Sequence, residues 1–134
     1  MENLSASIEE LKNIRDLKSK LSERESELAT PALSEITLIP DIYSLFKTLC
    51  TEKNKVLYRR KFLFIILRLF APSSLVGTKL PNGLRAELAK LFSETTPYVL
   101  SNDIRNILFF YQHYEEFRND VNKNYAKIKE MFIL

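Results

Sequence analysis

The side chains with the most distinctive chemistry lie between Thr95 and Asn106. Residues three and four apart are neighbours on a helix, so Leu100 and Ile104 share one face. The opposite face carries Tyr98, Ser101, Asn102, Arg105 and Asn106. Arginine can bond guanine with two parallel hydrogen bonds and asparagine can bond adenine in the same way. Two hydroxyl groups at the start of the helix, on Thr95 and Thr96, can reach phosphate. This pattern predicts DNA as the ligand.

Basic residues precede this stretch in an unusual concentration. The net charge is only +3, but residues 47–68 hold seven basic side chains and one acidic, whereas residues 1–28 hold five basic and seven acidic. A local basic patch attracts polyanions. We expect phosphate contacts from a set of cations in and after this segment: Arg59, Arg60, Lys61, Lys79 and Arg85. The alternative is a solvated loop and helix end with no ligand.

Catalytic and metal-binding patterns are absent from the sequence. His113 and Cys50 are the only residues of their kinds and fall in separate predicted helices, so the sequence has no zinc-ligand spacing and gives little support for a cysteine–histidine pair. Glu115 and Glu116, with Asp120 one turn further on, are typical of a solvated helix face. We therefore expect no enzyme activity, no metal and no cofactor.

Two predicted helices must position the polar face. Residues 84–92 place Leu84, Leu88, Leu91 and Phe92 on one side of a short helix, and the apolar stripe resumes from Leu100 to Tyr111. Between the two blocks, Thr96 can cap the second helix and Pro97 can take its first position, where a missing N–H costs nothing. So short a connection predicts a helix-turn-helix-like unit at residues 84–108.

The segment T-P-Y-V-L-S-N-D-I-R-N, preceded by Ala89 inside the first helix, resembles the helix-turn-helix of bacterial repressors and of sigma-factor region 4. This resemblance implies a DNA-binding function with the start of the second helix at the base edges. The segment departs from that pattern because Ser93-Glu94 replaces the turn glycine and the turn is about one residue longer. Glu94 and Asp103 also place negative charge near the predicted DNA face.

A wider resemblance covers the strings Y-R-R-K-F-L-F-I-I-L, L-P-N-G-L-R-A-E-L-A and L-F-F-Y-Q-H-Y-E-E-F-R-N-D-V. They are similar to short uncharacterised proteins of phages or mobile elements in Bacteroidetes-type bacteria. This likeness implies no activity by itself. Together with the predicted DNA binding, it leads us to expect a regulator of a phage or mobile element, in the cytoplasm of a bacterial or infected cell. The unpaired Cys50 agrees with a reducing compartment.

Scarce helix breakers predict an all-α fold. The chain of 134 residues has only two glycines and five prolines, and 46% of it is apolar, which is enough for a buried core. We expect about five helices, near residues 4–28, 41–51, 56–70, 84–92 and 97–131. The helix at 56–70 is apolar almost all round and should form the centre. The last helix either runs unbroken or has a joint near residues 119–124.

The two ends of the chain carry narrow apolar seams. Residues 1–30 predict an amphipathic, coiled-coil-like helix set apart from a helical domain at 41–134, with an extended connector between them. We expect a homo-oligomer joined through the terminal helices, although the first helix could instead pack on its own domain or on the last helix. No run is long and apolar enough to predict a membrane span.

A second function fits the same sequence. A helical structural or assembly protein, such as a scaffold or adaptor of a phage particle, would act through oligomeric helix contacts. DNA binding predicts one continuous basic and polar surface from Arg59–Lys61 to the outer face of residues 98–106. Assembly instead predicts intermolecular contacts through the terminal seams and through a set of aromatic residues: Phe109, Phe110, Tyr114 and Phe117.

Overall fold

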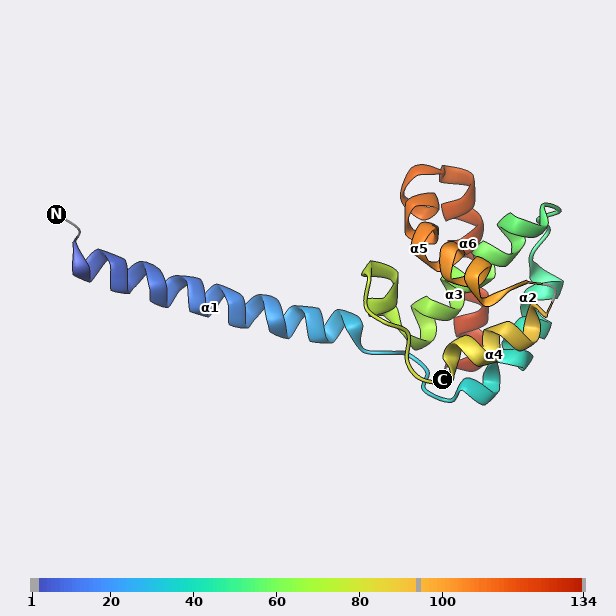
Figure 1. Cartoon of the computed structure of the whole chain (residues 1–134), viewed down its shortest axis with the longest axis horizontal. Coiled ribbons are helices and arrows are strands. Elements are labelled where there is room, and N and C mark those ends of the chain that lie inside the picture. The colour runs from blue at the N-terminus through green and yellow to red at the C-terminus, as the bar shows by residue number, and fades with distance from the viewer. Residues whose placement is uncertain (1–2, 94, 134) are drawn as a thin grey trace. The chain divides into compact units, whose positions relative to one another are not determined.

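A computed structural model describes residues 3–93 and 95–133 and confirms an all-α protein (Figure 1). The chain divides into two compact units, Met1–Thr30 and Pro31–Leu134. No strand occurs among the described residues, and none of their helices is long and apolar enough to span a bilayer. The helices are α1 (Leu4–Ala29), α2 (Ile39–Leu49), α3 (Lys55–Phe70), α4 (Leu84–Leu91), α5 (Pro97–His113) and α6 (Glu115–Phe132), with 3-10 helices η1 (Ile36–Leu38) and η2 (Pro72–Val76).

The centre of the second unit is α3, as predicted. Every residue from Lys61 to Phe70 is buried except Arg68, whose guanidinium lies over the Tyr125 ring. The helices α2, α5 and α6 and the 3-10 helix η2 all pack against it. The Asn54 side chain caps α3 by accepting hydrogen bonds from the N–H groups of Val56 and Leu57. A helix that is apolar on all sides is stable only when it is covered on all sides, which explains its central place.

The connector ahead of α2 is more helical than predicted. The N–H groups of Ala32 and Leu33 donate to the carbonyl of Leu69, which ties the start of the unit to the end of α3. The chain then forms η1, and α2 begins at Ile39, two residues before the predicted start. Pro40 is tolerated because it lies in the first turn of α2, where its missing N–H has no helical partner.

The C-terminal segment forms two helices, and this corrects the prediction of an unbroken helix and of a joint near residues 119–124. The break falls at Tyr114, whose backbone is extended. Figure 1 shows α5 and α6 lying side by side after this turn. A straight helix of this length would extend over roughly 50 Å and carry its far half away from the core. Folding back at Tyr114 lets both helices bury their apolar faces on α3.

The turn between α5 and α6 has its own polar contacts. The Arg118 guanidinium donates to the carbonyls of Tyr111 and Gln112, which lie at the end of α5. The Tyr111 hydroxyl donates to the Asn122 side chain across the hairpin, at 2.9 Å. The Tyr111 ring also stacks on Phe64 of α3, with centroids 4.4 Å apart. The two Arg118 hydrogen bonds satisfy carbonyls at the end of α5 that would otherwise lack helical partners.

The apolar seam of the last helix is used inside its own unit. Phe117, Val121 and Ile128 are buried, and α6 packs against α2, α3 and α5. The first helix differs, because α1 buries none of its side chains. Of the two terminal seams predicted from the sequence, the one in α1 therefore keeps its apolar residues exposed.

Candidate functional site

Three basic side chains from three segments surround one cleft in the second unit. The cleft has a volume of about 360 Å³ and is lined by Lys79 from the loop after η2, Arg85 from α4, and Ser101 and Arg105 from α5. All three cations are exposed. Among the described residues none of the three forms an ion pair, and no acidic side chain lines the cleft. Like charges held together without a counter-charge favour an anionic ligand.

The loop that carries Lys79 is shaped by two glycines. Gly77 ends η2 with φ +106°, and Gly83 precedes α4 with φ +86°, both in the left-handed region that favours glycine. The buried Ser74 hydroxyl donates to the Lys79 carbonyl at 3.4 Å, and the Thr78 N–H donates to the Ser73 carbonyl. These contacts fold the loop back on η2, so Lys79 lies at the cleft.

The outer face of α5 adjoins this cleft. Thr96 caps the helix by accepting from the Val99 N–H at 3.3 Å, and Pro97 occupies the first turn, both as predicted. Tyr98 is 73% exposed, and Asn102 and Arg105 are also exposed. These three lie four and three residues apart, so they form one stripe along the helix. The stripe presents a phenol, an amide and a guanidinium on the same side of the helix.

Three predicted contacts have their side chains engaged locally, among them Asn102, whose Oδ1 accepts from the Asn106 amide at 3.4 Å. The Asn106 amide donates to the backbone carbonyl of Asn102 at 2.8 Å, and the Thr96 hydroxyl oxygen is the helix cap. Thr95 is half-buried and lines a different cleft, of about 420 Å³, that also contains Lys53, Lys55 and Arg59. The structure thus separates Thr95 from the Lys79 cleft.

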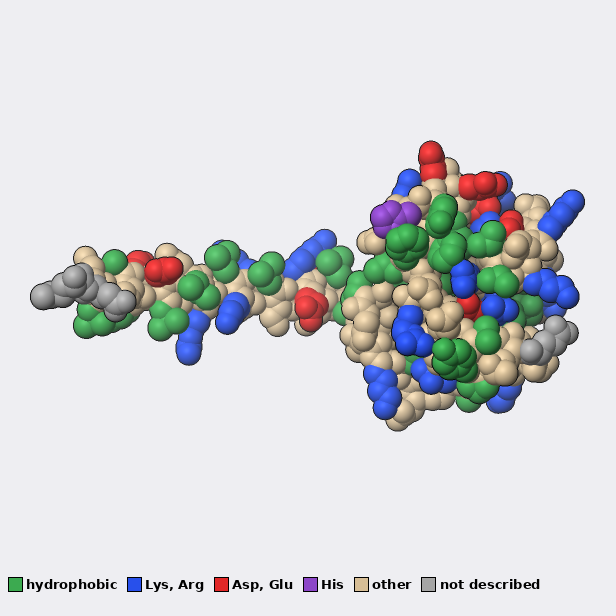
Figure 2. Space-filling model, turned by 45° about the horizontal axis from the view of Figure 1, so that its top comes forward, with side chains coloured by type: hydrophobic (Ala, Val, Ile, Leu, Met, Phe, Trp, Pro, Cys, Tyr) green, Lys and Arg blue, Asp and Glu red, His purple; other side chains and the backbone are tan. Residues whose placement is uncertain are grey.

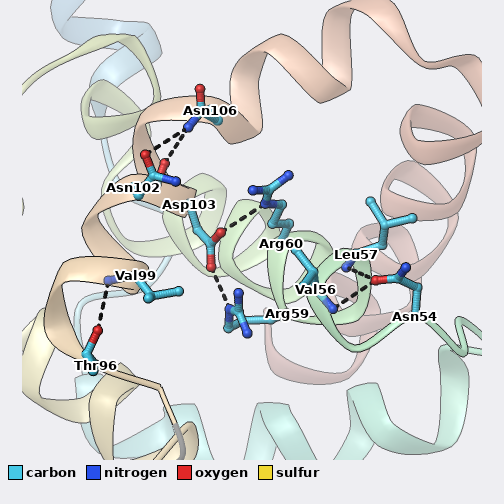
Figure 3. A network of polar contacts seen from close by, with 10 residues as sticks. All are labelled: Asn54, Val56, Leu57, Arg59, Arg60, Thr96, Val99, Asn102, Asp103 and Asn106. Carbon is cyan, nitrogen blue, oxygen red and sulfur yellow. Dashed lines mark hydrogen bonds and ion pairs between the residues drawn. The ribbon is translucent and has the colours of Figure 1, made fainter.

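Arg59 and Arg60 of α3 bind one carboxylate of α5. The Arg59 Nε lies 2.5 Å from Asp103 Oδ2, and the Arg60 Nε lies 2.9 Å from Oδ1 (Figure 3). The Arg60 guanidinium also lies 4.6 Å from the centre of the Phe110 ring. Both arginine side chains are mostly buried, at 13% and 17% exposed. They link α3 to α5, a role different from the predicted phosphate contacts.

Asp103 corrects the expectation of a negative charge near the outer face of α5. Its side chain is 1% exposed and points from α5 toward α3, between the two arginines (Figure 3). A buried carboxylate needs such partners, since an unpaired buried charge is costly. The other acidic residue of that expectation, Glu94, lies outside the described residues.

Lys61 is buried rather than available to a ligand. Its ammonium lies 2.6 Å from Asp120 Oδ2 and 3.5 Å from Glu52 Oε2, and its side chain is 3% exposed. Burial alone would lower the pKa of Lys61, but the hydrogen bond and charge of Asp120, with Glu52, outweigh it and raise the pKa. Lys61 therefore stays protonated and links α3 to α6.

The visible face of the second unit is mixed in charge. In Figure 2 most of its acidic side chains gather at one end, while Lys and Arg are spread over the rest of that face. Within the described part of the chain, no group of three or more His, Cys, Asp or Glu could hold a metal ion.

An exposed aromatic corner between α5 and α6 did not enter the predicted DNA-contact set. Phe109 and Tyr114 are 52% and 51% exposed, and the Phe109 ring lies 4.3 Å from the His113 ring. Phe110 is half-buried and Phe117 is buried beneath them. The run I-L-F-F-Y-Q-H-Y is the signal in the sequence, because it holds more aromatic residues than one buried stripe can use.

The described groups can bind an anion and donate to hydrogen-bond acceptors, chiefly through Lys79, Arg85, Asn102 and Arg105. Comparisons of the chain with models of protein families, with curated proteins and with solved structures found no match. What the chain binds must therefore be inferred from the arrangement of its own side chains.

Proposed function

We propose that this chain is a non-enzymatic DNA-binding protein that uses α4 and α5 as a helix-turn-helix-like unit. The observation that carries the proposal is the convergence of Lys79, Arg85 and Arg105 on one cleft beside the exposed stripe of α5. Lys79 and Arg85 bind backbone phosphates. Arg105 and Asn102 face base edges, with Tyr98 and Ser101 beside them.

The packing of the two helices supports this arrangement. Leu84 and Leu88 of α4 and Leu100 and Ile107 of α5 are buried, so each helix is held on one side and free on the other. Ala89, half-buried, leaves room for the close approach of the second helix. The connection from Phe92 to Thr96 is longer than in most helix-turn-helix units, which usually have three or four residues there.

The number of available cations predicts how strongly DNA binding should depend on salt concentration. Arg59, Arg60 and Lys61 already have acidic partners, so Lys79 and Arg85 are the cations left for phosphate contacts at this cleft. Each neutralised phosphate lowers the logarithm of the binding constant by about 0.9 per tenfold rise in salt. Two such contacts predict a slope of roughly −2 per protomer.

The test is a fluorescence-anisotropy titration with mixed-sequence duplex DNA at about 50 and about 200 mM salt. The parent chain should bind more weakly at the higher salt, and Asn102→Ala/Arg105→Ala should weaken binding about tenfold. A matched control, Gln112→Ala/Lys123→Ala, removes one amide and one exposed cation elsewhere and should bind as the parent does. No binding by folded protein at the lower salt would overturn the proposal.

The exposed aromatic corner favours a second function, a helical structural or assembly protein. Phe109 and Tyr114 offer apolar surface of the kind that protein interfaces use, beside a cleft of about 400 Å³ lined by His113, Glu115 and Glu116. Phe110 and Phe117 serve the core and are poor candidates for such contacts. If the DNA titration fails, substitution of Phe109→Ser/Tyr114→Ser tests this face by its effect on self-association.

A further inference from the structure

The helix α1 lacks the packing that normally stabilises a helix in a protein. It comprises 26 residues and buries none of its side chains. Its apolar residues are 42% to 73% exposed: Leu4, Ile8, Leu11, Ile14, Leu17, Leu21 and Leu28. Most helical stability in proteins comes from packing an apolar face. A contiguous exposed seam of this length marks an interaction surface.

The second half of α1 has the spacing of a two-stranded coiled coil. With Ile14 at position a, Leu21 and Leu28 also fall at a and Leu17 falls at d. Ile14, the one β-branched residue at position a, together with Leu17 at d is the combination that favours two strands in parallel coils. The frame begins at Ile14, because upstream the apolar residues from Ile8 step by three.

The charges beside this seam complement a second copy of the same helix. In this frame Lys20 takes position g and Glu25 takes position e of the next heptad. In a parallel, in-register dimer, position g of one helix faces position e of the next heptad in the other. Lys20 therefore faces Glu25 of the other protomer, and the two-fold symmetry makes two such pairs.

Arg24 occupies the remaining d position, and its guanidinium is bound by Glu27 of the same helix at 2.9 Å. In a parallel pair the two Arg24 side chains approach each other, which lowers stability, as polar residues at core positions do in coiled coils. The Arg24–Glu27 ion pair reduces this repulsion. A polar layer at one position also helps to fix the register of the two strands.

We propose that α1 pairs with α1 of a second copy as a parallel, two-stranded coiled coil over residues 14–29, with Lys20 of each chain facing Glu25 of the other. Pairing of α1 does not depend on DNA binding and stands or falls separately. In such a dimer both chains leave the coiled coil at the same end. The two DNA-binding units therefore follow from one end, as a two-fold DNA site requires.

The first test is the mass of the full chain in solution, measured by sedimentation equilibrium across the micromolar range. The parent chain should be a dimer, and Leu17→Glu/Leu21→Glu should be a monomer. Ser19→Glu/Ser22→Glu adds the same charge at outer positions and should remain dimeric. The substituted residues are exposed, so the second unit should keep the parent's thermal unfolding midpoint. A parent monomer, a trimer, or a dimer indifferent to the Leu17/Leu21 change would overturn the proposal.

The second test fixes the orientation of the helices. In a Cys50→Ser background, Leu21→Cys places one thiol in the seam and should oxidise to a covalent dimer, while Ser19→Cys on the outer face should not. Lys20→Glu and Glu25→Lys should each weaken the homodimer roughly tenfold, because two attractive pairs become repulsive. A mixture of these two variants should prefer the heterodimer, which restores both pairs. Equal cross-linking at positions 19 and 21, or no preference in the mixture, would overturn the parallel arrangement.

Discussion

The carboxylate of Asp103 and the guanidinium of Arg59 are 2.5 Å apart although 44 residues separate them in the chain. Arg60 binds the second oxygen of the same carboxylate, so one acidic residue of α5 holds two neighbouring residues of α3. Charge-assisted bonds of this geometry are short and directional. The pairing turns the face of α5 that carries Asn102 and Arg105 away from α3 and thereby sets which side chains of α5 are exposed.

Removing this carboxylate should be strongly destabilising. Asp103→Ala leaves two mostly buried guanidinium groups without an acceptor, and we expect a loss of about 2–4 kcal/mol in the free energy of unfolding. Asp103→Asn keeps the shape but loses the charge and should cost less. Urea unfolding followed by circular dichroism measures both. Glu130→Ala, an exposed acidic residue of α6, serves as the control and should change stability by less than about 0.5 kcal/mol. A loss of that small size for Asp103→Ala would contradict a structural role.

Asp103 also shows where residue type misleads a prediction from sequence. Position 103 is three residues after Leu100 and four before Ile107, so helical spacing alone places it on the buried stripe. An acidic residue is usually exposed, and the sequence prediction followed that tendency. Only the fold reveals the two arginines that make burial of this carboxylate possible.

Helix positions were predicted well because apolar spacing reports them directly. The centre at α3 and the cap at Thr96 with Pro97 were both confirmed. The break at Tyr114 was missed because neither glycine nor proline occurs there, and the helical spacing of apolar residues continues through it. Tertiary packing of α5 and α6 on α3 determines where the helix breaks. The helix propensities of the individual residues do not indicate this break.

The residues of the candidate cleft could be predicted one by one from the sequence, but their proximity could not. Lys79 and Arg85 were expected to contact phosphate and Arg105 was expected to contact a base edge, but their meeting depends on the path of the loop between η2 and α4. Two left-handed glycines and the Ser74 hydrogen bond set that path. Such a loop has no periodicity from which its course can be predicted.

The two loop glycines should differ in their tolerance of substitution. Both have positive φ, so replacement by alanine costs about 1 kcal/mol at either position from backbone strain. A Cβ at Gly77 meets nothing within 4 Å, whereas a Cβ at Gly83 lies 3.2 Å from Cδ1 of Ile36. We expect Gly83→Ala to lose about 1 kcal/mol more than Gly77→Ala, as measured by urea unfolding. Equal losses would mean that Ile36 moves aside freely.

Stability should decline at alkaline pH because one buried group and two half-buried groups hold their protons more tightly in the folded state. Burial raises the pKa of the Cys50 thiol, and burial also raises that of the Tyr58 hydroxyl. The pKa of Lys61 is raised by Asp120 against the effect of burial. A group with a raised folded pKa contributes its full stability below its unfolded pKa and loses it as pH rises through the folded value.

We therefore expect the free energy of unfolding not to change with pH near neutrality through these groups, and to fall above about pH 9, where the thiol of the unfolded chain ionises. Lys61→Met should cost about 1–2 kcal/mol at neutral pH and should flatten the decline above about pH 10. Urea midpoints measured at neutral and alkaline pH give both quantities. Cys50→Ser isolates the contribution of the thiol, since this variant should lose only the part of the stability decline that begins at the lower pH. A Lys61→Met variant with the parent's full alkaline decline would contradict the assigned pairing with Asp120.

The proposed phosphate contacts of the cleft predict a result that a dependence on net charge alone would not give. Lys79→Ala/Arg85→Ala should weaken binding to duplex DNA and reduce the magnitude of the salt slope by about 2, one for each lost phosphate contact. The charge-matched control Lys123→Ala/Lys127→Ala removes two exposed cations of α6 and should leave the slope unchanged. Anisotropy titrations over a range of salt concentrations measure the slope directly. Equal slopes for the two double variants would show that binding follows net charge, and the cleft would then have no special part in it.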